Sequence, residues 1–513
     1  MKIEGIDKVL IIGSGPIVIG QACEFDYSGT QACKALREQG YKIVLVNSNP
    51  ATIMTDPVMA DATYIEPLNV ARLTQIIEKE RPQALLPNLG GQTGLNLASA
   101  LSKAGVLDKY GVKVIGVNLD AIERGEDREI FKETMQKLGI DTPRSGICHS
   151  VEEAEKIVAE IGYPVVVRPA YTMGGAGGGF CYNVEELRTI CSNGLELSMT
   201  HQCLIEESIL GWEELEVEVV RDSKNQMIAI CFIENIDPVG VHTGDSFCAA
   251  PFLTIDKKLE EELKEKAFKI VESIGVIGGT NVQFAHDPKT GRVVIIEINP
   301  RTSRSSARAS KATGFPIALI SATLAAGLTL DQIPYWRDGS LEKYTPSGDY
   351  VVLKFARWAF EKFRGVDDCL GTQMKAVGEV MAIGKTYKET LQKAIRGLEN
   401  GRSGLGFAKD FNKKSKEELL EMLKTPSSER HFQMYEAIRK GATGEEIFAA
   451  TYEKAYFVQQ MRELVELEEE MLKTPGRLPA DELLIKAKKD GFSDKYIAKI
   501  LGIREKDVRK KRT

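Results

Sequence analysis

Several features that would assign a long chain to a class at once are missing from this sequence. Its nine cysteines form no CxxC pair and no zinc-ligand spacing, which leaves the thiols a structural role. The longest apolar run, around residues 317–326, is far shorter than the roughly 20 residues that cross a bilayer. No signal peptide opens the sequence, so we expect a cytoplasmic protein with reduced thiols and no membrane partner.

An excess of charge of one sign is missing as well. The 67 Lys and Arg residues against 73 Asp and Glu residues give a net charge of −6, too small to indicate nucleic acid as a general partner. The hydrophobic fraction of 43% is typical of a soluble globular protein. Because one core stops growing at roughly 250–300 residues, a chain of 513 residues should hold three or four domains.

The order of apolar segments predicts an α/β fold with a helical end. Short apolar strands alternate with helical stretches at the start, which is typical of a parallel, doubly wound domain, here residues 1–120. Strand patterns dominate residues 204–300, interrupted by one long helix at 257–273. We therefore expect a second domain over 121–390, and an all-helical third domain over 391–513, where the sequence is charged and helix-periodic.

The strand RVVIIEIN ends in two oxygen-bearing side chains. Side chains alternate between the faces of a strand, so Glu297 and Asn299 should point the same way. Such a pair can hold a hard cation such as Mg²⁺ against phosphates. Arg301 and Arg304 follow on the exit loop, where they could meet anionic oxygens. Taken alone, the segment equally fits a strand end followed by a solvated polar loop.

The glycine-rich segment GSGPIVIG, residues 13–20, fits neither familiar nucleotide-binding motif. A dinucleotide fingerprint needs a third glycine where Val18 stands, and a P-loop needs Lys and Ser or Thr where Gln21 and Ala22 stand. What remains is a tight turn from strand to helix, whose amides could face an anion.

A second glycine-rich segment carries a stronger signal. Residues 173–179 read MGGAGGG. Because glycine has no side chain, the backbone amides of such a segment are accessible, as in a flap able to lie over a triphosphate. Arg168 stands at the end of the strand before it, with its charge available to phosphate oxygens. The alternative is a flexible surface hairpin.

Other polar residues of the middle region gain interest from their position in strands. Glu214, Glu216 and Glu218 should share one face of a strand, a pattern that usually indicates a solvated face. Glu207 ends a strand at a linker, a common place for a carboxylate that binds ribose hydroxyls. Gln283 lies in the strand NVQF, and its amide oxygen could complete a metal site beside Glu297.

Two further residues favour structural roles. His242, one of five histidines, lies in a polar loop flanked by glycines, where a single histidine is more often structural than catalytic. Cys148 in GICHS has part of a glutaminase-like nucleophile turn, but Ser150 replaces the final glycine. We therefore predict a structural role for the Cys148 thiol.

Taken together, six motifs resemble the amino-terminal half of the large subunit of carbamoyl-phosphate synthetase, an ATP-grasp family, almost from end to end. The motifs are GSGPIVIGQACEFDYSG, NSNPATIMTD, RPAYTMGGAGGG, GVHTGDS, NVQFA and EINPRTSRSSARASKATGFP. The resemblance implies a pre-ATP-grasp domain, an ATP-grasp domain of two subdomains, and a helical oligomerisation domain. It also implies an ATP-dependent ligase that phosphorylates bicarbonate and lets ammonia displace the phosphate, giving carbamate for arginine and pyrimidine biosynthesis.

The resemblance also implies which residues bind the ligands. Gln283, Glu297 and Asn299 would hold Mg²⁺ or Mn²⁺, and Arg301 and Arg304 would face bicarbonate and the transferred phosphoryl group. The glycine flap would exclude water from the labile carboxyphosphate. A pocket for K⁺ would match Glu214, Asn235 and Ser246. The implied ATP pocket comprises Arg128, Arg168, Gly174, Gly175, Glu207, Ile209, Glu214, Gly240, Val241, His242, Gln283 and Glu297.

The chain also departs from the family pattern. Arg308 stands where an apolar residue is expected, at a position that we predict to lie just off the site. The second half of the family's large subunit, which phosphorylates carbamate, does not follow Thr513. We therefore expect partners: a carbamate-phosphorylating half, a glutaminase small subunit that supplies ammonia, and further copies in an oligomer.

Two other functions stay open. The segment 491–513 is similar to a helix-turn-helix with Gly502 at the turn, and residues 495–513 hold eight basic against two acidic residues, a face that could bind DNA phosphates. The alternative for this tail is a small helical subdomain packed on a partner. The chain could also be another ATP-grasp ligase of the carboxylase type, such as a biotin carboxylase, although the SNPATIMTD and oligomerisation segments argue against it.

Overall fold

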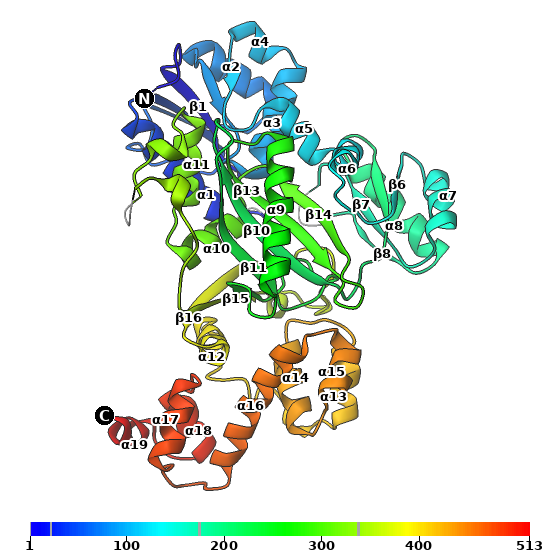
Figure 1. Cartoon of the computed structure of the whole chain (residues 1–513), viewed down its shortest axis with the longest axis vertical. Helices are drawn as coiled ribbons and strands as arrows, with labels where there is room; N and C mark the ends of the chain where they lie inside the picture. Colours follow the sequence, from blue (N-terminus) through cyan, green and yellow to red (C-terminus); the bar gives the residue numbers. More distant parts are fainter. Residues whose placement is uncertain (1, 21–22, 173–175, 336–338) are drawn as a thin grey trace.

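The computed structural model describes residues 2–20, 23–172, 176–335 and 339–513 (Figure 1). The chain begins with a five-stranded parallel sheet in the order β3-β2-β1-β4-β5, which confirms the predicted parallel first region. Its strands are β1 (Lys8–Ile12), β2 (Lys42–Asn47), β3 (Ala62–Ile65), β4 (Ala84–Leu86) and β5 (Lys113–Val114). Its helices are α1 (Cys23–Glu38), α2 (Val70–Glu80), α3 (Gly91–Lys103), α4 (Val106–Tyr110) and α5 (Leu119–Glu126).

The turn after β1 packs tightly against the end of β2. The amide of Gly15 donates to Oδ1 of Asn47 at 2.8 Å, and Gly15 has a φ of +78° that favours glycine. A Cβ on Gly13 would lie 2.6 Å from the Asn47 side chain, so only glycine fits there. The first glycine-rich segment is therefore a strand-to-helix turn, as predicted.

A small antiparallel sheet projects to one side of the molecule (Figure 1). Its strands pack with two helices around a core of their own, which includes Cys148, Cys191 and Cys203. Cys148 is fully buried with its Sγ 3.8 Å from that of Cys191, so its predicted structural role agrees with its place. The strands, in the order β6-β9-β7-β8, are β6 (Ser145–Cys148), β9 (Cys203–Glu207), β7 (Val165–Pro169) and β8 (Gly179–Cys181), with helices α6 (Arg128–Lys137), α7 (Val151–Ile161) and α8 (Val184–Leu197) nearby.

The centre of the molecule is a seven-stranded antiparallel sheet in the order β14-β13-β10-β11-β12-β15-β16. One of its faces shares an apolar core with the first sheet, while α11 reaches back to the opposite face of the first sheet. Its strands are β10 (Glu213–Arg221), β11 (Met227–Asn235), β12 (Cys248–Ala250), β13 (Gly278–His286), β14 (Val293–Asn299), β15 (Val351–Arg357) and β16 (Gly378–Gly384). Its helices are α9 (Lys257–Ile274), α10 (Arg304–Thr313) and α11 (Ile317–Ala325).

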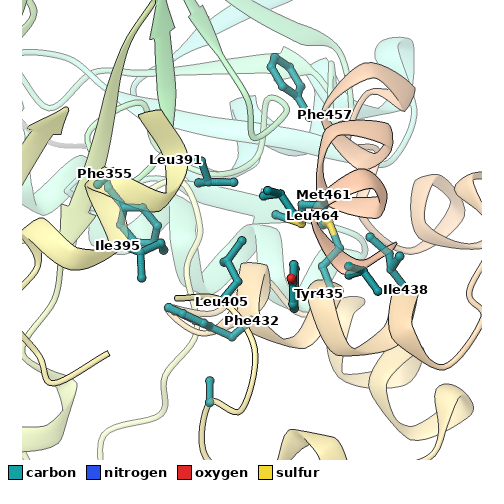
Figure 2. Close-up of a cluster of buried hydrophobic side chains, with 14 of the residues drawn as sticks. Phe355, Leu391, Ile395, Leu405, Phe432, Tyr435, Ile438, Phe457, Met461 and Leu464 are labelled. Atoms are coloured by element: carbon teal, nitrogen blue, oxygen red, sulfur yellow. The ribbon is translucent and has the colours of Figure 1, made fainter. Parts of the chain in front are cut away.

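The chain ends in helices, as predicted. They share one apolar core with β15 and β16 at one edge of the central sheet, and Figure 2 shows side chains of β15, α12, α14 and α16 meeting there. The helices are α12 (Tyr387–Gly397), α13 (Lys416–Leu423), α14 (Arg430–Arg439), α15 (Gly444–Thr451), α16 (Ala455–Leu472), α17 (Asp481–Lys489), α18 (Asp494–Leu501) and α19 (Glu505–Arg512). The predicted domain boundaries stay predictions, with α5 and α12 running across residues 120 and 390.

The basic tail forms two short helices with Gly502 between them in the left-handed conformation. Several of its cations pair within the helical end: Arg512 contacts Asp494 at 3.0 Å and Lys511 contacts Asp481 at 2.5 Å. Asp494 also pairs with Lys488. These pairs favour the interpretation of the tail as a packed helical subdomain. In the part of the chain that the structure describes, none of the helices has the length and apolarity to span a membrane.

Candidate functional site

A cavity of about 260 Å³ lies where the two antiparallel sheets and the first domain meet. Gly178, at the far end of the second glycine-rich segment, also lines it. Gly174 and Gly175 lie outside the described residues. The sequence-predicted residues that line the cavity are Arg128, Arg168, Glu207, Ile209, Glu214, Gly240, Val241, His242, Gln283, Glu297, Asn299, Arg301 and Arg304.

The metal-ligand candidates come from two neighbouring strands. β13 and β14 pair antiparallel with Gln283 opposite Glu297 and Asn281 opposite Asn299. Directly opposite residues of an antiparallel pair have their side chains on the same face, about 5 Å apart. The pairing therefore brings Gln283, Glu297 and Asn299 to one wall of the cavity, as the alternation of the strands predicts.

Asn281, which the sequence analysis did not select, orients two of these side chains. Its Oδ1 accepts from Nε2 of Gln283 at 2.9 Å and from Nδ2 of Asn299 at 3.3 Å. Its own Nδ2 donates to Glu216 and Glu218, at 2.9 Å each. With their NH₂ groups engaged, both amides keep their carbonyl oxygens for another ligand.

These donors fit a hard divalent cation that also binds phosphate. One carboxylate and two amide oxygens are an oxygen-only set, which suits Mg²⁺ or Mn²⁺. Within the described ranges, no cluster of three or more His, Cys, Asp or Glu side chains could hold a metal without such help. A cation here would thus need oxygens from substrate or water, as Mg²⁺ usually does beside phosphates.

Two arginines control the charge of Glu297. Nη2 of Arg168 lies 2.7 Å from Oε2 of Glu297, and Nη2 of Arg128 lies 3.8 Å from the same oxygen. Arg168 also pairs with Glu206 at 3.1 Å. Burial alone would raise the pKa of Glu297, but the charges of Arg168 and Arg128 hold it below the usual value. Glu297 is therefore ionised, the form in which a carboxylate can bind a cation.

Arg301 and Arg304 extend the wall beyond β14. Ser303 caps α10 and places Arg304 in its first turn, while Nε of Arg301 donates to Gln92 at 3.3 Å. Among the described residues, Nε and Nη2 of Arg304 are buried and have no hydrogen-bond partner, although Glu24 lies 3.5 Å from Nε and Glu379 lies 3.6 Å from Nη2. Donors left open in a buried site suit an anionic ligand.

The loop between β11 and β12, residues 236–247, forms the facing wall and is called the site loop here. It includes Gly240, whose φ of +126° only glycine adopts readily and where a Cβ would lie 2.4 Å from Leu210. Burial lowers the pKa of His242, which is therefore neutral. Its Nδ1 accepts from the Gly244 amide at 2.9 Å, so the ring proton is assigned to Nε2.

Glu207 is engaged by two arginines rather than left open. It accepts from the amide and Nε of Arg144 and from Nη1 of Arg292, at 2.7–2.9 Å. Burial alone would raise the pKa of Glu207, but the hydrogen bonds from the two arginines lower it by more. The pKa therefore lies below its usual value, and the group is ionised. Glu207 lines the cavity edge, and ribose binding by this carboxylate stays a prediction.

The prediction that Glu214, Glu216 and Glu218 form a solvated face is wrong. They are 6%, 0% and 0% exposed, respectively, because α10 covers Glu216 and Glu218 while Glu214 lies in the wall of the cavity. Ser305 of α10 donates to Glu216 at 2.7 Å and Ser306 donates to Glu218 at 3.0 Å. Burial raises the pKa of Glu214 well above its usual value and that of Glu218 to about 8.

Arg308 also differs from expectation, because it lines the cavity instead of lying off the site. It is 5% exposed and lies 3.9 Å from both Glu216 and Glu379. The two buried carboxylates explain why position 308 holds an arginine and not an apolar residue.

Two residues of the predicted K⁺ pocket have different hydrogen-bond partners. Asn235 donates to Glu216 at 3.2 Å, and Ser246 donates to Asp237 at 3.3 Å.

Sequence reasoning missed other residues of the cavity wall. Asn281 is two positions before Gln283 and could have been found by strand alternation. Gln92, on α3, and Glu126, at the end of α5, come from helices of the parallel-sheet region, and no local pattern marks them.

Comparison with known proteins assigns most of the chain to one family. Three family models match: the carbamoyl phosphate synthase preATP-grasp domain at residues 5–124, the carbamoyl-phosphate synthase L chain ATP binding domain at 127–333, and the carbamoyl-phosphate synthetase large chain oligomerisation domain at 379–513. The three models follow the order of the parallel sheet, the two antiparallel sheets and the helical end.

Solved structures show the same ATP-grasp fold at low sequence identity. The biotin carboxylase domain of 2-oxoglutarate carboxylase from Hydrogenobacter thermophilus superimposes with a TM-score of 0.60 at 18% identity, covering 89% of this chain and 98% of that one. An N5-carboxyaminoimidazole ribonucleotide synthetase in complex with ADP gives a TM-score of 0.54 at 16% identity, covering 78% of this chain and 97% of that one. These likenesses concern the fold.

Curated relatives are far more similar in sequence. The carbamoyl phosphate synthase large chain of Archaeoglobus fulgidus is 54% identical over 100% of this chain, which matches 48% of that protein. The chain thus spans about half the length of such relatives. The large chain, N-terminal section, of Aquifex aeolicus is 53% identical over 99% of this chain and 91% of that protein. The chain therefore belongs to the carbamoyl phosphate synthase large chain family, as a counterpart of its amino-terminal half.

Proposed function

We propose that the cavity is a carboxyphosphate-forming site. An oxygen of bicarbonate attacks the γ-phosphorus of ATP, ADP leaves, and ammonia then displaces phosphate from the carbonyl carbon to give carbamate. The observation that carries the proposal is that the oriented Gln283, Glu297 and Asn299 oxygens face buried arginines across one cavity. Phosphoryl transfer needs mainly positioning and charge neutralisation, which these groups supply without a covalent nucleophile.

The proposed roles divide the wall into three parts. Gln283, Glu297 and Asn299 would hold Mg²⁺ or Mn²⁺, which when bound supplies charge neutralisation at the phosphates. Arg301 and Arg304 would bind bicarbonate and the transferred phosphoryl group. The residues proposed for ATP are Arg128, Arg168, Gly174, Gly175, Glu207, Ile209, Glu214, Gly240, Val241, His242, Gln283 and Glu297.

Partner chains would complete the pathway. A carbamate-phosphorylating half would use the carbamate, a glutaminase subunit would supply ammonia, and the helical end would support an oligomer in the cytoplasm. Arginine and pyrimidine biosynthesis would consume the product. The match to the oligomerisation model at residues 379–513 supports the oligomer, and the half-length coverage of relatives supports the second half. K⁺ would act as an additional cofactor near Asn235.

The test is ADP release by the purified chain with MgATP, with and without bicarbonate, then with ammonia. Bicarbonate-dependent ADP release is expected, and ammonia should increase it. Free biotin serves as the control for a carboxylase-type ligase, and stimulation by biotin in place of ammonia would overturn the proposal. If the chain alone releases no ADP, a candidate second half is added. Absence of ADP release in that mixture as well would contradict the enzyme assignment.

Arginine substitution separates the anion site from the ATP site. Arg304→Ala should reduce bicarbonate-dependent turnover about 10²-fold or more while changing ADP affinity little, because its unpartnered donors are proposed to bind the reacting anion. An equal loss of turnover and nucleotide affinity would instead assign Arg304 to nucleotide positioning.

A further inference from the structure

The site loop is held from behind by the helical end of the chain. Val239 through Gly244 line the cavity, while Asp237 at the start of the loop is 3% exposed and turned toward the protein interior. Asp237 closes the loop on itself: its Oδ2 accepts from the Phe247 amide at 2.9 Å and from the Ser246 hydroxyl at 3.3 Å. The loop conformation therefore depends on this carboxylate.

The partner of Asp237 comes from a distant part of the chain. Arg430, the first residue of α14, donates from Nε to Oδ1 at 2.5 Å and from Nη2 to Oδ2 at 2.6 Å. The same Nη2 lies 3.3 Å from the Asp245 carbonyl oxygen, so one guanidinium contacts both ends of the site loop. A bidentate pair of this kind fixes orientation as well as distance.

The arginine is itself held rigidly. Its Nη1 donates to the Ser427 carbonyl at 2.8 Å, and its guanidinium carbon lies 5.0 Å from the Phe247 ring centre and 5.5 Å from that of Trp358. It is 4% exposed. Burial would raise the pKa of Asp237, but the Arg430 charge and hydrogen bonds hold it at about 2, so the pair stays ionised.

A second connection runs in parallel through residues 368–376. On one side, the His242 amide donates to the Gly371 carbonyl at 2.8 Å, and Met374 of this segment lines the cavity. On the other side, the Leu370 amide donates to the Pro426 carbonyl at 2.8 Å and Ser428 donates to Asp368 from its amide at 2.8 Å. The turn before α14 thus supports the cavity wall at two places.

The apolar packing around these bonds is continuous. Val241 and Phe247 of the site loop belong to the same buried core as Phe432 and Tyr435 of α14, part of which appears in Figure 2. A shift of α14 would therefore move the site loop, because close-packed cores transmit displacement.

We propose that Arg430 is a positioning residue for the nucleotide site, so that the helical end builds part of the ATP pocket besides its expected role in oligomerisation. This inference rests on the proposed nucleotide site. Arg430 acts through Asp237 on the site loop, and its loss should weaken nucleotide binding more than it slows the chemistry.

The experiment compares Arg430→Lys and Arg430→Met with Arg439→Lys in the full chain. Arg439 is the matched control because it closes the same helix and pairs with Glu436, Glu468 and Glu469, all within the helical end. ADP affinity by calorimetry, the KM for ATP, kcat and the thermal midpoint are measured for each.

Arg430→Lys should raise the ADP Kd and the KM for ATP about tenfold, and Arg430→Met further, with kcat changed less than about threefold. The lysine variant should keep more nucleotide affinity than the methionine variant, because lysine keeps the positive charge but cannot form the bidentate pair with Asp237. Arg439→Lys should lower the thermal midpoint but leave the Kd and KM within about twofold. Asp237→Asn, which keeps an acceptor for the Phe247 amide, provides a second variant if Arg430→Met fails to fold.

Equal KM and Kd values for the Arg430 and Arg439 variants would overturn the inference while leaving the proposed function intact. A wild-type chain that binds neither ADP nor ATP would overturn both. Equal losses of kcat and affinity in Arg430→Lys would also count against a positioning role, since they would indicate general disruption of the site.

Discussion

The parallel sheet and the central sheet, which share an apolar core, are buried to a similar degree but differ in what they bury. β1 of the parallel sheet reads KVLII, and Val9 through Ile12 are fully buried among apolar helices. β10 of the central sheet reads EELEVEVVR, with Leu215, Val217 and Val219 packed on one face. Its other face buries carboxylates instead.

The difference shows that burial alone does not separate a supporting sheet from an active one. An unpaired buried carboxylate is costly, and hydrogen bonds from Asn281, Ser305 and Ser306 offset this cost at Glu216 and Glu218. The guanidinium of Arg308, 3.9 Å from Glu216, adds an opposite charge. Through Asn281, the hydrogen bonds of these carboxylates continue to the side-chain amides of Gln283 and Asn299, which face the cavity. Substitutions of cavity residues in the central sheet should therefore reduce activity more than stability. Substitutions in the core of the parallel sheet should reduce stability more than activity.

The largest effect is expected at Glu297. Glu297→Ala should reduce bicarbonate-dependent ATP hydrolysis about 10³-fold, roughly 4 kcal/mol of transition-state stabilisation, because the proposed cation loses its carboxylate. The fold should remain, since the side chain is replaced in a polar cavity rather than in a core. Steady-state ADP release and circular dichroism check this. Wild-type turnover in this variant would show that Glu297 is not a ligand of the catalytic cation.

The converse is expected in the parallel sheet. Leu10→Ala should lower the free energy of unfolding by about 2–5 kcal/mol, because a fully buried leucine leaves a cavity. At 25 °C, kcat and the KM for ATP should stay within about twofold of wild type. Urea unfolding and ADP release are measured on the same preparation. A large loss of turnover in folded protein would contradict the proposed division between the sheets.

A smaller effect is expected where the network reaches the ligands. Asn281→Leu frees the Gln283 and Asn299 amides to rotate, so the Mg²⁺ concentration for half-maximal turnover should rise about 10–100-fold. Thr280→Val is the matched control on the adjacent, opposite-facing position, where the hydroxyl has no hydrogen-bond partner among the described residues. An unchanged Mg²⁺ requirement in Asn281→Leu would show that Asn281 does not orient the ligands.

The sequence was informative where strand alternation decides the geometry. The Gln283, Glu297 and Asn299 set follows from two strands whose pairing brings these residues together, and the parallel first sheet follows from its alternating elements. Alternation says which side chains share a face but not what covers it. The burial of Glu216 and Glu218 depends on α10, which packs from almost 90 residues away, and is invisible locally.

The same limit applies to long-range partners. Gln92 reaches the cavity from the first domain, and Arg430 reaches the site loop from the helical end, 193 positions after Asp237. A charged residue in a helix-periodic segment is ordinarily solvated, so nothing near Arg430 in sequence predicts a buried pair. Arg308 could be recognised as unusual, but its place depended on which carboxylates surround it.

The smallest expected effect concerns the proton on Glu218. Burial raises its pKa from 4.5 to about 8, so between these values the folded state holds a proton that the unfolded state releases. The free energy of unfolding should therefore fall as pH rises, by about 2 kcal/mol between pH 6 and 8, and Glu218→Gln should remove this part of the slope. Urea midpoints at the two pH values test it, with Glu261→Gln on the exposed face of α9 as the control. If Glu218→Gln keeps the wild-type slope, Glu218 is ionised in the folded state, and the charge of Arg308 together with the donors of Asn281, Ser305 and Ser306 would have to stabilise two buried carboxylates.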